Sequence, residues 1–310
     1  MNADLMFKCS DGYELVYNLW LPEEGRQVRY FLQIIHGMVE HSARYKRYAK
    51  ELNEHGIAVF AADLRGHGKS TSPEDRGWFG ESDGWARVAK DNFELANYIT
   101  TKYGARQTFL LGCSMGSLFA RTVMVDHPDF YSGVLILGTT ASQGIVGAAG
   151  RLVAKRQIKK NGAKAKGHLL SKLTFGPYAK SVAEARTEFD WLSTDPEEVD
   201  KYINDPDCGF VCTNRFYLDL LDGVAYANSP RNAASLPKDL PLIIISGEDD
   251  PVGGMGRGVR KVYNLYKKAG INDVTLKILK GARHEILNDF TRDDVHKMTI
   301  DWMDAHASEI

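Results

Sequence analysis

Short apolar runs alternate with amphipathic segments along most of this 310-residue chain, and this alternation restricts the fold more than any other feature. The apolar runs, rich in β-branched residues, lie at 5–9, 13–20, 28–35, 57–62, 107–111, 133–137, 242–246 and 274–279. Segments with helical periodicity lie at 44–55, 84–103, 117–126, 257–269 and 292–306. From residue 28 onward this pattern is typical of strand–helix–strand crossovers. We therefore predict an α/β fold with a doubly wound, mostly parallel sheet, preceded by a hairpin across Asp11-Gly12.

The alternation is interrupted between about residues 140 and 235. Helical patterns follow one another there without a convincing buried strand. An insertion into the α/β core explains this interruption. We therefore predict a core made of residues 1–139 and 236–310, with residues 140–235 forming an inserted helical cap.

The overall charge excludes no enzyme class but gives no reason to expect a nucleic-acid partner. The 39 basic residues are balanced by 40 acidic ones, whereas nucleic-acid-binding domains are usually strongly basic.

The first 20 residues lack the basic start and apolar core of a secretory signal, and four cysteines are too few for a disulfide framework. Cys208 and Cys212 lack the spacing and partner ligands of a zinc site. We expect a cytoplasmic protein without a bound metal.

The motif GCSMG places Ser114 between two glycines, with a predicted strand before it and a predicted helix after it. An abrupt strand-to-helix turn has room only for glycine on either side of the central residue. Such a turn exposes the serine oxygen above the sheet and directs backbone N–H groups toward a developing oxyanion. Because a serine hydroxyl is a poor nucleophile at neutral pH, Ser114 needs a base that is itself held in place.

The candidates for the acid and the base follow the serine in the order that this turn requires. The motif LIIISGEDDPV ends a predicted strand and then offers Glu248, Asp249 and Asp250. The motif VTLKILKGARHEIL places His284 in a loop after the last predicted strand. We therefore predict that His284 is the catalytic base.

An oxyanion hole needs two hydrogen-bond donors. The residue after the nucleophile, Met115, supplies one backbone N–H, and a loop after an early strand supplies the other. The motif FLQIIHGMVEHS places His36 and Gly37 directly at a strand end, so the backbone N–H of Met38 is the second candidate. We interpret His36 as a residue that orients this loop.

Five motifs together resemble one fold family: IIHGMVEHSARY, AADLRGHGKS, GCSMG, GEDDPV and GARHEIL, in that order over residues 34–287. They resemble the α/β-hydrolase fold and, more closely, its monoacylglycerol lipase and lysophospholipase group of serine aminopeptidase-like hydrolases. In that group a helical cap is inserted after the strand that follows the nucleophile helix, and the strand-poor region falls in that place. The resemblance implies a serine hydrolase that cleaves carboxylic esters through an acyl-enzyme and uses no cofactor.

The resemblance also assigns roles to residues. It makes Ser114 the nucleophile, His284 the base and Asp250 the acid, because the family's acid lies three residues after the glycine that ends the strand. The amides of Met38 and Met115 would form the oxyanion hole. The segment 65–68 would be a structural loop.

Several alternative substrates and functions are compatible with the same catalytic residues. The favoured substrate is a monoacylglycerol or lysophospholipid, and the alternative is a short-chain ester. An aminopeptidase would need acidic cap residues to hold a substrate amine, and Glu184, Glu188 and Asp190 are the candidates. A ligand-binding protein that keeps the fold without turnover belongs to another class, but the complete set of serine, acid and histidine favours an enzyme.

The cap carries eight Lys and Arg residues between Arg151 and Lys172, and no acidic residue occurs from Ala141 to Ala183. Apolar side chains share one side of a predicted helix here, namely Ile145, Ala149, Leu152 and Val153. One interpretation is a helix that contacts an anionic membrane surface or attracts anionic amphiphiles. The favoured one is a solvated basic face on a mobile lid, because runs of charge are usually solvated.

Overall fold

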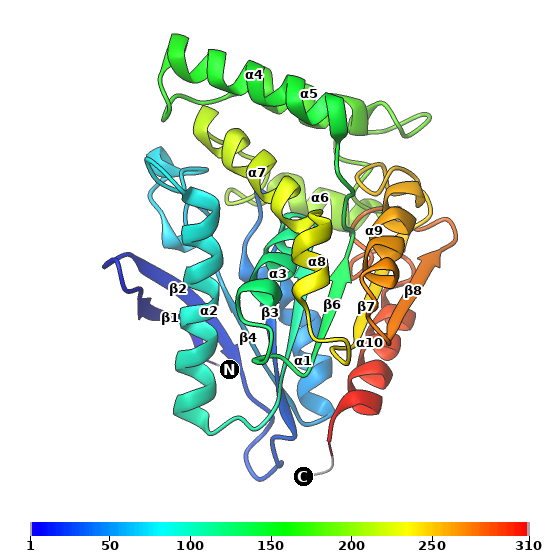
Figure 1. Cartoon of the computed structure of the whole chain (residues 1–310). Helices are drawn as coiled ribbons and strands as arrows, with labels where there is room; N and C mark the ends of the chain where they lie inside the picture. Colours follow the sequence, from blue (N-terminus) through cyan, green and yellow to red (C-terminus); the bar gives the residue numbers. More distant parts are fainter. Residues whose placement is uncertain (1, 309–310) are drawn as a thin grey trace.

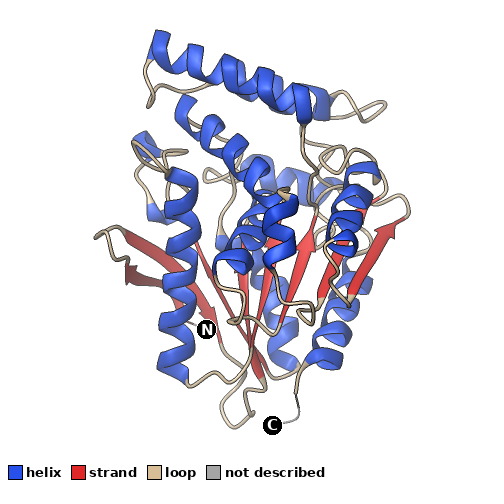
Figure 2. Ribbon diagram, viewed as in Figure 1, coloured by secondary structure: helices blue, strands red, loops and turns tan. Residues whose placement is uncertain are grey.

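The computed structural model describes residues 2–308, and a single eight-stranded sheet forms its centre (Figure 2). The strands are ordered β1-β2-β4-β3-β5-β6-β7-β8. β1 and β2 are antiparallel to their neighbours, and the remaining strands are parallel. Their bounds are β1 Asn2–Lys8, β2 Glu14–Trp20, β3 Tyr30–Ile35, β4 Ile57–Ala62, β5 Thr108–Cys113, β6 Gly133–Leu137, β7 Leu242–Gly247 and β8 Val274–Leu279. The predicted hairpin and mostly parallel sheet are confirmed.

Helices cover both faces of the sheet (Figure 1). Helices α1 (Lys46–Glu54) and α10 (Arg292–His306) pack on one face. Helices α2 (Gly84–Tyr103), α3 (Met115–Asp126) and α9 (Arg257–Lys268) pack on the other. Because both faces are covered, the central strands β3 and β4 are buried along their whole length, which explains why they are continuous apolar runs.

The segment between β6 and β7 contains helices and, within the described residues, only an isolated bridge between Lys166 and Thr213. Its helices are α4 (Gly144–Asn161), α5 (His168–Ala179), α6 (Pro196–Asn204), α7 (Asn214–Ala227) and α8 (Pro230–Ser235). Figure 1 shows α4 and α5 above the carboxyl ends of the parallel strands, with α6 and α7 beneath them. Helix α8 returns to the layer of α3 and α9. We propose that residues 140–235 form a cap over the core.

The apolar residues that share one side of the predicted helix have different surroundings in α4. Ile145 and Leu152 are 90% and 71% exposed, whereas Val153 lines the wall of a cavity. The buried side of α4 is set by Gly150 and Ala154, where the helix packs closely on α7. Small residues allow this close approach of α4 to α7. The larger apolar side chains Ile145 and Leu152 lie on another side of the helix and are therefore exposed to solvent. Within residues 2–308, no helix combines the length and the apolar composition needed to cross a bilayer.

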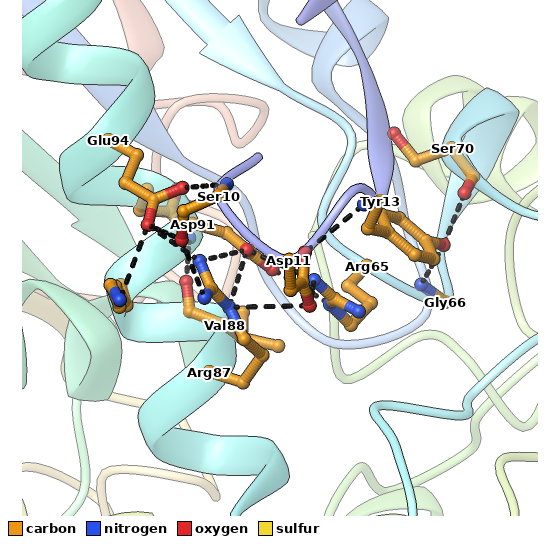
Figure 3. A network of polar contacts seen from close by, with 12 residues as sticks. Ser10, Asp11, Tyr13, Arg65, Gly66, Ser70, Arg87, Val88, Asp91 and Glu94 are labelled. Carbon is orange, nitrogen blue, oxygen red and sulfur yellow. Dashed lines mark hydrogen bonds and ion pairs between the residues drawn. The ribbon is translucent and has the colours of Figure 1, made fainter. Parts of the chain in front are cut away.

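The β1–β2 hairpin is fastened to α2 by a network of charged side chains (Figure 3). Arg65 donates to Asp11 at 2.7 Å and to Asp91 at 2.8 Å. Arg87 pairs with the same Asp91 at 2.7 Å and with Glu94 at 3.0 Å. The loop that contains Arg65 follows the carboxyl end of β4 and is part of this structural network.

Candidate active site

Ser114 lies on the predicted turn between β5 and α3, in a backbone conformation that side chains rarely adopt, with φ 52° and ψ −118°. The flanking glycines are required by close backbone contacts. A Cβ on Gly112 would lie 2.2 Å from the carbonyl oxygen of Gly116, and a Cβ on Gly116 would lie 2.0 Å from that of Ile35. These distances leave no room for a side chain. Strain of this kind is characteristic of functional turns.

His284 and Asp250 form a buried pair. Nδ1 of His284 lies 2.9 Å from Oδ1 of Asp250. The same Oδ1 accepts a hydrogen bond from the amide of Val252 at 2.9 Å, and Oδ2 accepts one from the Ser246 hydroxyl at 3.1 Å. Asp250 is fully buried, whereas the neighbouring Glu248 and Asp249 are exposed. Of the three acids that the sequence offered, the structure brings only Asp250 to the histidine.

The surroundings of His284 determine its protonation. Burial lowers its pKa, but the charge of Asp250 and the hydrogen bond to it outweigh burial, so the pKa of His284 is raised above 6.5. The Trp191 ring packs against the imidazole with 5.2 Å between centroids. The Ser114 hydroxyl makes no hydrogen bond to His284, although both residues line one cavity. Hydrogen bonds of this type often tighten only when substrate is bound.

The loop after β3 lies directly against Ser114. A Cβ on Gly37 would lie 3.3 Å from the Cβ of Ser114. Met38 and Met115 both line the cavity that contains Ser114. Met115 is the first residue of α3, where a backbone N–H has no acceptor within the helix. Both residues predicted to supply oxyanion donors are thus beside the serine.

His36 holds this loop in place. It is fully buried, its Nδ1 lies 2.8 Å from the carbonyl oxygen of Gly37, and its Nε2 accepts a hydrogen bond from the amide of Leu64 at 2.9 Å. Burial lowers the pKa of His36 to about 4. A neutral imidazole that accepts through Nε2 carries its proton on Nδ1, so His36 links the ends of β3 and β4.

Two cavities meet at Ser114. The larger has a volume of about 590 Å³ and is lined mainly by apolar side chains, including Leu118 on α3, Val153 on α4 and Val224 on α7. The smaller has a volume of about 60 Å³, and His284 contributes to its wall. The serine is therefore open to an apolar space on one side and a small, more polar space on the other.

Three charged side chains in the smaller cavity were not identified from the sequence. Arg44 donates to Glu285 through both terminal nitrogens at 2.7 Å, and to Glu40 at 2.6 Å. Glu40 also accepts from the amide of Gly37 and, at 3.0 Å, from the Tyr45 hydroxyl. Glu285 directly follows His284, so Arg44 connects the two loops that border Ser114. The available signals were the arginine in EHSARY and the glutamate in ARHEIL.

Two groups of side chains in residues 2–308 bring three possible metal ligands within 4.8 Å of one another. They are His41, Asp205 and Cys208, and Cys9, Asp11 and Asp91. In the second group both carboxylates are already paired with Arg65. Neither group lines the cavities at Ser114.

Comparison with known proteins places this geometry in context. Residues 26–291 match the family model described as "Serine aminopeptidase, S33". The chain is 26% identical to the monoacylglycerol lipase of Mycolicibacterium smegmatis over 95% of this chain and 94% of that protein. It is 28% identical to human monoglyceride lipase over 89% of this chain and 81% of that protein. A carboxyl esterase from Bacillus coagulans, solved with glycerol, has a TM-score of 0.90 at 28% identity and 98% coverage of both chains.

Proposed function

Because this chain belongs to the serine aminopeptidase S33 family and is a carboxylic ester hydrolase of the α/β-hydrolase fold, we propose that it cleaves monoacylglycerols through an acyl-enzyme on Ser114. The observation that carries this proposal is the buried pair of His284 and Asp250 at the cavity that contains a strained, glycine-flanked serine. Asp250 holds the tautomer of His284 in which Nδ1 is protonated, so that Nε2 is free to act as a base.

The reaction proceeds in two steps. His284 takes the proton of Ser114 while the serine oxygen attacks the ester carbonyl, and the N–H groups of Met38 and Met115 stabilise the oxyanion. His284 then returns the proton to the departing alcohol, which leaves the acyl group on Ser114. Water then attacks the acyl carbonyl while His284 takes a proton from it. His284 passes that proton to the oxygen of Ser114 as the bond between this oxygen and the acyl group breaks, which releases the carboxylic acid and restores the serine.

The larger cavity supports an acyl substrate. Its volume of about 590 Å³ falls within the usual range of roughly 300–1,000 Å³ for ligand pockets. Leu170, Leu173 and Leu220 are among its apolar lining residues. An acyl chain buried there would place its ester carbonyl at Ser114.

The smaller cavity supports an uncharged alcohol group. The carboxylates of Glu40 and Glu285 outnumber the guanidinium of Arg44, so a negatively charged phosphate would be repelled. A volume of about 60 Å³ suits a small hydroxylated group. Glycerol meets both requirements, and we therefore favour a monoacylglycerol over a lysophospholipid. A short-chain ester remains the alternative if the larger cavity does not hold the acyl group.

Peptidase activity has less support. Neither cavity at Ser114 is lined by Glu184, Glu188 or Asp190, the acids that the sequence offered for a substrate amine. Asp190 is instead engaged by the backbone of Arg186 and the hydroxyl of Thr187. The two acids that do line the smaller cavity are paired with Arg44.

We also propose a cytoplasmic enzyme that contacts membranes peripherally through its cap. Exposed apolar residues on α4, Ile145, Val146 and Leu152, lie near exposed lysines, and Val146 also lines the larger cavity. Apolar side chains flanked by cations are typical of helices that lie on anionic lipid surfaces. All four cysteines are free, which suits a reducing compartment.

The membrane proposal is tested by flotation with vesicles of neutral or anionic lipid. We expect stronger binding to anionic vesicles and loss of binding in the I145S/L152S variant. Met6→Ser, which changes an exposed apolar residue on β1, serves as the control. Equal binding to both vesicle types, or unchanged binding by the double variant, would contradict the proposal.

The substrate proposal is tested by initial rates on p-nitrophenyl esters with acyl chains from two to sixteen carbons. We expect the rate to peak at about eight carbons or longer, as an apolar cavity requires, and monoacylglycerols to be cleaved faster than lysophospholipids. A peak at the shortest chains would indicate a small-ester hydrolase. Faster cleavage of an aminoacyl arylamide would indicate a peptidase.

A further inference from the structure

Arg121 is a fully buried cation whose hydrogen-bond partners are all neutral. It lies on α3, two turns after Ser114, and its Nε donates to the hydroxyl of Tyr266 on α9 at 2.8 Å. No carboxylate within residues 2–308 forms an ion pair with it. A charge buried without a counter-ion is costly unless dipoles surround it. Its other four contacts supply those dipoles.

Those four contacts come from two places, which we call the cap ends: residues 139 and 140, where the proposed cap begins, and residues 227 and 228, after which α8 returns to the core. Nη1 donates to Oγ1 of Thr139 at 3.3 Å and to the carbonyl oxygen of Thr140 at 3.2 Å, where the chain leaves β6. Nη2 donates to the carbonyl oxygen of Ala227 at 2.6 Å and to Oδ1 of Asn228 at 3.0 Å, at the end of α7. A guanidinium has five N–H groups, so every donor has an acceptor only while both ends are in place.

The two ends also contact each other. The side-chain amide of Asn228 donates to the carbonyl oxygen of Thr140 at 3.3 Å and to that of Val224 at 2.9 Å. Ala227 is the last residue of α7, where the helix dipole favours a cation. Displacement of either end would therefore leave the fully buried Arg121 with unsatisfied donors. Thr140 and Val224 also line the larger cavity.

We propose that Arg121 is a positioning residue that fixes both attachments of the cap and so holds the walls of the acyl-binding cavity. This inference rests on the proposed function, because it assigns the larger cavity to the acyl chain. A short ester reacts at Ser114 without filling that cavity, whereas a long acyl chain needs its walls. Loss of the Arg121 contacts should therefore affect long-chain substrates selectively.

The test compares Arg121→Met and Arg121→Lys with the wild-type protein on acetyl and dodecanoyl p-nitrophenyl esters. We expect KM for the dodecanoyl ester to rise about tenfold, a change comparable to the loss of one buried hydrogen bond, with little change for the acetyl ester. Arg121→Lys should show the same rise in KM as Arg121→Met, because the lysine ammonium lacks the planar guanidinium that reaches both cap ends. Asn228→Ala, a milder change in the same contact, should shift KM in the same direction. Arg65→Met, which removes a buried arginine of the hairpin network, is the matched control and should not discriminate between the esters.

Hydrogen exchange separates this inference from the proposed function. Backbone amides of residues 139–145 and 224–230 should exchange faster in Arg121→Met and Asn228→Ala than in the wild type or Arg65→Met. If the wild type hydrolyses no ester, the proposed function fails, and the exchange rates alone decide the role of Arg121. Unchanged exchange in these segments, or an equal rise in KM for both esters, would overturn the proposal.

Discussion

Oδ1 of Asp250 lies 2.9 Å from Nδ1 of His284, while the adjacent Asp249 is exposed to solvent. This difference between neighbouring carboxylates gives a matched pair of variants. Asp250→Asn should lower kcat by roughly 10⁴-fold, because the imidazole loses both its orientation and the charge that stabilises its protonated form. Asp249→Asn should leave kcat close to that of the wild type. Steady-state kinetics of both variants on one ester tests this difference in kcat. Equal activity of the two variants would show that Asp250 has no catalytic role.

The raised pKa of His284 predicts the pH dependence of the reaction. Burial lowers this pKa, but the charge and hydrogen bond of Asp250 outweigh burial and bring it above 6.5. Only the neutral imidazole accepts the serine proton, so kcat/KM should fall as the pH decreases through the pKa of His284, with a midpoint above 6.5. In Asp250→Asn the residual activity should show a lower midpoint. A wild-type midpoint at or below 6.5 would contradict the assigned electrostatics.

The same shift has a consequence for stability. A histidine whose pKa is raised on folding stabilises the native state fully at pH values below the unfolded pKa of about 6.5. That contribution is lost as the pH rises through the higher folded pKa. The free energy of unfolding of the wild type, relative to a His284→Gln variant, should therefore decrease over this interval. Urea unfolding of both proteins at several pH values measures this difference in the free energy of unfolding. A difference that increases with pH would contradict the raised pKa of His284.

Much of the fold could be predicted because its signals are local. Helix α2 spans the predicted residues 84–103, and β4 spans the predicted residues 57–62. Buried parallel strands and amphipathic helices each repeat over a few residues, so periodicity identifies them. Ser114 and His284 could be predicted because each follows a strand of the same sheet, whereas the choice of Asp250 over Glu248 and Asp249 depended on the resemblance to the family.

Contacts between distant segments could not be predicted in this way. Arg44 and Glu285 are 241 residues apart, and nothing in the local pattern of either residue indicates the other. The side of α4 that is buried depends on how closely α7 approaches Gly150, which is a property of packing. Arg121 lies among apolar residues of α3. One basic residue does not change the hydrophobic periodicity of a helix, so its contacts could not be predicted from the sequence.

The close backbone contacts at Gly116 predict a strong effect on stability. Gly116→Ala would place a Cβ 2.0 Å from the carbonyl oxygen of Ile35, so the backbone must shift, at a cost of about 3 kcal/mol. Gly150→Ala is the control, because its Cβ would meet only ordinary contacts, at 3.4 Å, within helix α4. Alanine there should be neutral or stabilising by up to about 1 kcal/mol. Urea unfolding of both variants checks the contrast, and similar stabilities would show that the turn tolerates a side chain.

The lining of the larger cavity predicts a change in chain-length preference. Val153 contributes to its wall, and Val153→Phe should fill part of the space that we assign to the acyl chain. The optimal p-nitrophenyl ester should become shorter, while the rate on the acetyl ester stays close to the wild-type rate. Val28→Phe makes the same exchange outside this cavity and should leave the profile unchanged. A profile that Val153→Phe also leaves unchanged would place the acyl chain elsewhere.

The acyl-enzyme on Ser114 is the central claim, and intact-mass spectrometry tests it most directly. The wild-type protein and Ser114→Ala are each incubated with a fluorophosphonate, and their hydrolysis of a monoacylglycerol is measured in parallel. We predict a single covalent adduct on the wild type, no adduct on Ser114→Ala, and a fall in kcat of roughly 10⁴-fold or more in the variant. An adduct on Ser114→Ala, or wild-type activity in that variant, would contradict the account.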